Sequence, residues 1–139
     1  MGIVEEKGIR DKKLSSGKYS ITQDKIDKAL KNELSGVRFT VQPTYNPRIR
    51  SYGKTVGEYR RGITNEIYKI KSIEVGPQGS NEIEFLLDTL LHEELEARIM
   101  LKGGRLHEMS DDKRHEYIDR FIKRFFKLKG WDYGKTKVK

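Results

Sequence analysis

The 139-residue chain has no cysteine, which excludes disulfides, thiolate metal sites and cysteine nucleophiles together. It also has no apolar run near the roughly 20 residues that a membrane-spanning helix needs. Residues 1–6 contain no apolar segment of the signal-peptide type, so the sequence predicts no signal peptide. Hydrophobic residues make up only 35% of the chain, but regular apolar spacing between residues 20 and 130 favours a folded domain over disorder.

The charge is unbalanced, with 29 lysines and arginines against 21 acids and a net charge of +8. A chain this basic attracts polyanions, which makes nucleic acid a candidate partner. The same charge also serves solubility alone, so composition leaves both interpretations open.

The apolar spacing predicts an α+β fold with an N-terminal helix, a small antiparallel sheet and two long C-terminal helices. Thr22 is the expected N-cap of the first helix and Gly36 its stop. The other predicted elements are a strand at 37–41, one strand or two short ones with a bulge at 65–75, a helix at about 80–101 and a last helix at about 110–129.

The domain boundaries follow from the same patterns. Residues 1–20 resemble a flexible leader or linker, since lysines and glycines alternate there with little periodicity. Residues 21–133 form the single predicted domain, and residues 134–139 form a basic tail. Between the first strand and the second, residues 43–62 are rich in turn-forming glycine and proline, so they are expected to be a loop.

The helix at 80–101 is acidic, with six acids and one base, and leaves a charge of +13 on the remaining chain. A helical wheel sets Glu94 and Arg98 on its apolar side at i, i+4 spacing, where an acid and a base can pair. Ionised groups near a core are costly unless they are paired. The pair therefore belongs either to a buried structural network or to a functional site, and the adjacent His92 and Glu93 favour the site.

His92 lies at the margin of this apolar stripe, and His115 lies on the inward face of the last helix. The two imidazoles can therefore face each other, which suits a general base and a general acid near neutral pH. An alternative is zinc, because His92–Glu96 resembles the metalloprotease pattern H-E-x-x-H with Glu96 in place of the second histidine. In that alternative His92, Glu96 and His115 form a two-histidine, one-carboxylate site.

The segment 43–62 carries a local charge of +4, with tyrosines at every seventh position from Tyr45 to Tyr59. Arginine forks bind phosphates and tyrosines stack on unpaired bases, so this composition suits RNA. The alternative is a solvated loop whose tyrosines cover the core. The residues expected to contact nucleic acid are Arg48, Arg50, Lys54, Arg60, Arg61 and Tyr52.

The compact, basic, cysteine-free domain and its segment 88–98 (DTLLHEELEAR) resemble the C-terminal nuclease toxin domains of bacterial polymorphic and contact-dependent inhibition systems. The resemblance is one of type and covers residues 20–130. It implies a small metal-independent ribonuclease, without a cofactor, of a barnase-like or related α+β fold. It also implies an RNA substrate such as tRNA, an acidic immunity protein as partner, and action in the cytoplasm of a target cell.

The chemistry of such an enzyme assigns roles to the candidate residues. His92 and His115 would carry the two proton transfers, in either order, while Arg98 binds the phosphate and Glu94 orients it. Glu93 would be a reserve base. Two alternatives of other classes stay open, a nucleic-acid-binding module without catalysis and a zinc-dependent hydrolase.

Overall fold

The computed structural model describes residues 2–7, 21–60, 66–77, 83–103 and 109–133. It confirms the predicted α+β class, with one short and two long helices around a small sheet. Within these residues, no helix combines the length and hydropathy that crossing a membrane requires. The elements in chain order are β1 (Gly2–Lys7), α1 (Gln23–Lys31), β2 (Thr44–Tyr45), β3 (Gly53–Tyr59), β4 (Ile67–Val75), α2 (Ile83–Lys102) and α4 (Asp111–Lys129).

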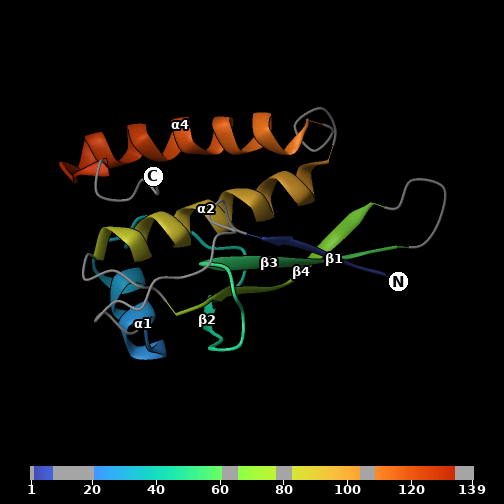
Figure 1. Ribbon diagram of the computed structural model, residues 1–139, viewed down its shortest axis with the longest axis horizontal. Coiled ribbons are helices and arrows are strands. Elements are labelled where there is room, and N and C mark those ends of the chain that lie inside the picture. The colour runs from blue at the N-terminus through green and yellow to red at the C-terminus, as the bar shows by residue number, and fades with distance from the viewer. Residues whose placement is uncertain (1, 8–20, 61–65, 78–82, 104–108, 134–139) are drawn as a thin grey trace.

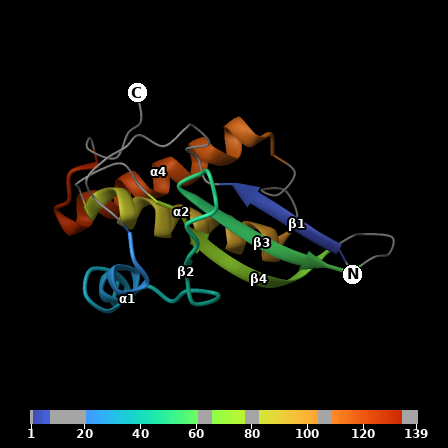
Figure 2. The ribbon, with the colours of Figure 1, turned by 60° about the horizontal axis from the view of Figure 1, so that its bottom comes forward.

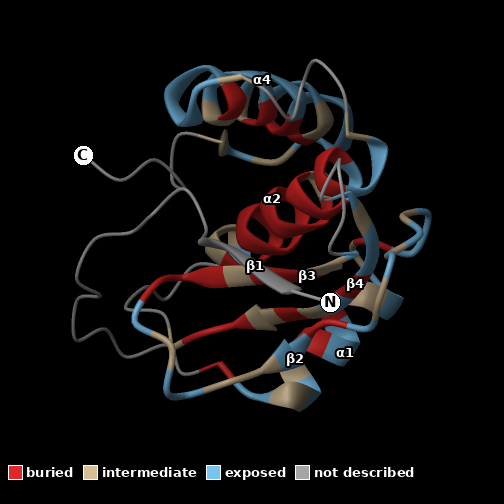
Figure 3. Cartoon of the chain, turned by 90° about the vertical axis from the view of Figure 1, so that its right-hand side faces the viewer, coloured by how far each residue is buried: buried red, intermediate tan, exposed pale blue. Residues whose placement is uncertain are grey.

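Helix α2 is the central element of the fold. It lies against one face of the sheet, and α4 covers the side of α2 that points away from the sheet (Figures 1 and 2). Figure 3 shows the resulting layers, in which α2 is buried along most of its length while α4 keeps an exposed outer side. Thirteen of the 20 residues of α2 are buried, so its polar side chains must find partners inside the protein.

The ends of the helices follow the expected capping chemistry. The Thr22 hydroxyl accepts a hydrogen bond from the backbone amide of Lys25, and Ser110 does the same for α4. Gly130 ends α4 in the left-handed conformation, with φ at 74°. Helix α1 ends earlier than predicted, at Lys31, because Asn32 caps it before Gly36 is reached.

The sheet has the order β1-β3-β4-β2 and is mixed, since the two-residue β2 pairs in parallel with β4 while the other pairs are antiparallel. Of the region 65–75, Ile67–Val75 forms the single strand β4, and its register with β3 shifts at two points, as the expected bulge implied. The predicted strand at 37–41 is wrong. The backbone amide of Thr40 donates to the Glu94 carboxylate at 2.7 Å and is therefore not available for a ladder.

Three strands lie where the sequence predicted none, and two of them, β2 and β3, fall in the segment 43–62. Residues 2–7, expected in a leader, pair as β1 along the edge of β3, whereas residues 8–20 and 134–139 lie outside the described residues. Strand β3 runs through the segment 43–62 that was expected to be a loop. The glycines that suggested turns have another role there, because they let α2 approach the strand closely.

Gly53 shows how close this approach is. A Cβ atom at Gly53 would lie 2.8 Å from Cγ of Glu93 and 2.8 Å from Cγ2 of Thr89, both on α2. A Cβ atom at Gly57 would lie 2.8 Å from Cε of Met100. The core beside this contact is formed by buried Ile70, Ile73, Ala97 and Met100, and a larger cluster lies between α2, α1 and α4.

We predict that Gly53→Ala lowers the free energy of unfolding by about 1–3 kcal/mol, because the added methyl group pushes α2 away from β3. Gly36→Ala is the matched control, since a Cβ there has no atom within 4 Å. Urea unfolding of both variants measures the difference, and equal stability of the two would contradict this account of the glycines in β3.

Candidate functional site

Three of the predicted polar residues meet between α2 and α4. His92 and Glu96 lie one helical turn apart on α2, and His115 faces them from α4. Nε2 of each histidine lies 3.9 Å from Oε1 of Glu96. The two imidazole rings are 5.3 Å apart between centroids, so the expectation that the two histidines face each other is confirmed. We call His92, Glu96 and His115 the histidine cluster.

The histidine cluster is closed on its inner side and open on its outer side. The side chains of His92 and Glu96 are 1% and 0% exposed, whereas that of His115 is 25% exposed. A small molecule or ion from solvent would therefore meet the His115 side first. His92 is too deeply buried to touch a polymer directly.

Arg114 completes the surroundings of the cluster, and no sequence pattern marked it as a site residue. Its Nε donates to Oε1 of Glu96 at 3.1 Å, and Nη2 lies 3.0 Å from Oδ1 of Asp111. A buried carboxylate held by an arginine has a fixed orientation. In the sequence, only its position next to His115 pointed to Arg114 as a site residue. Its contact with Glu96 depends on how α4 packs on α2, and that register cannot be read from either helix alone.

The buried surface of α2 is strongly acidic. Asp88, Glu93, Glu94 and Glu96 are all at most 2% exposed, and the buried arginine Arg114 pairs with Glu96. Burying carboxylates is expensive unless positive charge or hydrogen-bond donors accompany them. A cation at the histidine cluster, either an imidazolium or a metal ion, would reduce that cost.

Glu93 does not belong to the histidine cluster. It points to the sheet, where the Thr55 hydroxyl donates to its Oε1 at 2.9 Å and Gly53 lies against its side chain. In the H-E-x-x-H pattern the glutamate next to the first histidine acts at the metal site. The structure instead places Glu93, expected as a reserve base, against β3 on another face of α2.

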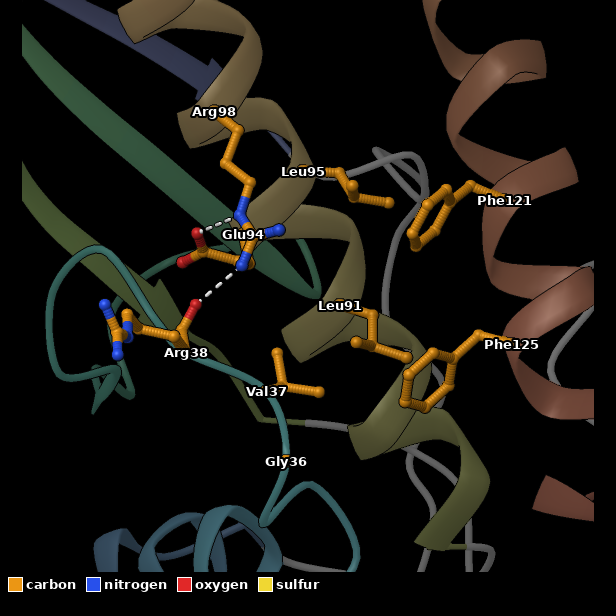
Figure 4. Close-up of a pocket in the computed structure, with 9 residues that line it drawn as sticks. All are labelled: Gly36, Val37, Arg38, Leu91, Glu94, Leu95, Arg98, Phe121 and Phe125. Carbon is orange, nitrogen blue, oxygen red and sulfur yellow. Dashed lines mark hydrogen bonds and ion pairs between the residues drawn. The ribbon is translucent and has the colours of Figure 1, made fainter. Parts of the chain in front are cut away.

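The predicted Glu94–Arg98 pair is confirmed, with Arg98 Nε donating to Oε2 of Glu94 at 2.8 Å. Glu94 also accepts from the amide and the hydroxyl of Thr40, and Arg98 Nη2 donates to the carbonyl of Arg38 at 2.6 Å. Figure 4 shows the bond from Arg98 to Glu94 and the bond from Arg98 to the carbonyl of Arg38 in the segment after α1. The pair therefore holds residues 38–40 against α2. These bonds explain the position of the Arg98 side chain without a phosphate ligand.

A pocket of about 290 Å³ lies beside this pair. Figure 4 shows the rings of Phe121 and Phe125 reaching toward it from α4, opposite the segment that contains Arg38. The histidine cluster is not part of its lining, so His92 and Arg98, expected in one site, serve two different sides of α2. The lining residues are Gly36, Val37, Arg38, Leu91, Glu94, Leu95, Arg98, Phe121 and Phe125.

Of the expected nucleic-acid contacts, Arg48 and Arg50 are exposed between β2 and β3, and Lys54 is half-buried on β3. Arg61 lies outside the described residues. Tyr52 is 7% exposed and packs against Phe85 with ring centroids 6.2 Å apart. The prediction that Tyr52 stacks on a base is therefore wrong, and the alternative of a tyrosine covering the core holds at this position.

Arg60 is exposed but has a partner within the protein. Its guanidinium lies 4.8 Å from the centroid of the Tyr68 ring on β4, and the Tyr68 hydroxyl donates to Glu58. Desolvation, followed by this hydrogen bond to Glu58, raises the pKa of the Tyr68 phenol. The three side chains form a surface network on the sheet.

We predict that Arg98→Ala lowers the free energy of unfolding by about 1 kcal/mol, because it removes two charge-assisted hydrogen bonds from a half-exposed side chain. Arg38→Ala is the control, since the bond from Arg98 uses only the backbone carbonyl of Arg38. Urea unfolding measures both variants. If Arg38→Ala is as unstable as Arg98→Ala, the pair does not fasten this segment.

Comparisons of the chain with protein-family models, with curated proteins and with solved structures find no match. The resemblance to nuclease toxin domains therefore rests on the sequence features alone. Any function must be argued from the chemistry of the histidine cluster and from the charge around it.

Proposed function

We propose that this protein is a hydrolase that cleaves RNA at the histidine cluster. One observation carries the proposal. His92 from α2 and His115 from α4 both place Nε2 at 3.9 Å from the same carboxylate oxygen, Oε1 of Glu96. Titratable groups gathered in this way at an interface that is partly open to solvent are typical of catalytic and metal sites.

Two chemistries are open to this set of residues. The imidazoles act as proton donor and acceptor toward a 2′-hydroxyl and a leaving oxygen, or they hold a metal ion that polarises a phosphate. Direct proton transfer needs both rings against the substrate, and His92 is 1% exposed. Its burial gives the metal-assisted chemistry more support than the metal-free chemistry that the sequence favoured.

The surface charge supports a polyanionic substrate. Exposed basic residues flank the pocket and the loop between β2 and β3, and more of them follow the outer side of α4 beyond its midpoint. Such a surface attracts nucleic acid over several ångströms. The exposed residues are Arg38, Arg48, Arg50, Arg60, Arg120, Lys123, Arg124, Lys127 and Lys129.

The toxin role and the partner belong to this proposal as well. A ribonuclease acting in the cytoplasm of a target cell must be neutralised in the cell that makes it. An acidic immunity protein would complement the net charge of +8. These two points rest on the resemblance of segment 88–98 and on charge.

We predict that His115→Ala reduces cleavage of total RNA by at least about 100-fold, because it removes the cluster member that a phosphate can reach. The assay compares gels of RNA incubated with equal amounts of folded wild-type and variant protein. Glu116→Gln is the control, because Glu116 is exposed and follows His115 in the sequence. Within the described residues, its carboxylate pairs with Arg120 and not with the histidine cluster.

Full activity of His115→Ala would rule out the histidine cluster as the reacting site. RNA that is bound by the wild type but never cleaved would instead identify a nucleic-acid-binding module, the second candidate. The exposed basic residues of α4 are the observation that favours this second function.

A further inference from the structure

We infer that His92, Glu96 and His115 bind one divalent transition-metal ion, with Zn²⁺ as the best chemical match. The inference deepens the proposed function and rests on it only for the use of the ion in catalysis. Metal binding itself follows from the geometry of the histidine cluster and is measured without RNA.

The three side chains already have nearly the separations that a metal ion requires. Each offers one ligand atom, and these atoms all lie within 4.8 Å of one another, with both histidine-to-carboxylate distances at 3.9 Å. Tetrahedral zinc with bonds of 2.0–2.2 Å separates neighbouring ligand atoms by about 3.3 Å. Zinc binding therefore requires each histidine nitrogen and the carboxylate oxygen to move closer together by about 0.6 Å.

The donor set suits zinc better than calcium or magnesium. Two imidazole nitrogens and one carboxylate oxygen form a ligand set used in catalytic zinc sites, which keep a fourth position open. Here the fourth position would lie toward His115, the one partly exposed member of the cluster. A zinc ion held in this way supplies Lewis acidity toward a phosphate oxygen or water.

Arg114 fits the role of an outer partner to the metal ligand. A carboxylate has lone pairs enough to accept from Arg114 and to bind an ion at the same time. Ligating carboxylates are commonly held by such outer hydrogen bonds. Asp111, which lies 3.0 Å from the Arg114 guanidinium, offsets its positive charge and so reduces its repulsion of a metal ion.

The charge around the cluster favours a cation there over a bare phosphate. Glu96 places a fully buried carboxylate at the cluster itself. Asp112, three residues before His115 on α4, is an exposed acid that adds negative charge at the solvent side. A phosphate that approaches this side meets repulsion unless a metal ion intervenes.

The test uses the full chain, treated with EDTA and dialysed, and titrates it with Zn²⁺ by calorimetry and with Co²⁺ by visible absorption. We expect one ion per wild-type chain and Co²⁺ bands of a four- or five-coordinate site. His115→Ala should weaken the affinity at least about 10-fold, and the neighbouring Glu116→Gln should leave it unchanged within about 3-fold.

A wild-type chain that binds no stoichiometric Zn²⁺, or an equal affinity in His115→Ala, would overturn the inference. His92→Ala carries the risk of unfolding because the side chain is buried, whereas His115 lies at the edge of the cluster. The two proposals fail separately. Zinc binding without RNA cleavage refutes only the function, and cleavage by a zinc-free chain in EDTA refutes only the use of the ion in catalysis.

Discussion

The burial of carboxylates along α2 is the constraint on which the rest of the structure depends. A helix covered by the sheet and by α4 leaves no solvent for Asp88, Glu93, Glu94 and Glu96. Three of these acids have neighbours on different elements, with Thr55 on β3 beside Glu93, Thr40 beside Glu94 and Arg114 beside Glu96. Each of these three acids therefore ties α2 to a different part of the domain, and together they fix its rotation and position.

This arrangement separates structural from chemical roles along one short segment. The Glu94–Arg98 pair holds the segment after α1, and Glu93 meets the close-packed glycine of β3. The face of α2 that points to α4 is the one where histidines lie beside a carboxylate, that of Glu96. Consecutive residues of a helix point about 100° apart, so adjacent acids in the sequence cannot share one site.

The sequence predicted what depends on periodicity and capping, namely the two long helices, the strand at 67–75, the Glu94–Arg98 pair and the facing of His92 and His115. It failed where a residue's role depends on a distant element. Gly53 appeared to mark a turn because the helix that packs on it lies 30 residues later in the chain. Arg114 was missed for the same reason, since only the packing of α4 on α2 brings it to Glu96.

Helices α2 and α4 together build the proposed cation site from two imidazoles and one carboxylate. X-ray absorption at the zinc edge of the loaded protein tests it most directly, because the spectrum reports the ligands themselves. The account predicts two imidazole nitrogens with oxygen ligands at about 2.0–2.2 Å, and one imidazole fewer in His115→Ala. A spectrum with oxygen ligands alone, or one that His115→Ala leaves unchanged, would contradict it.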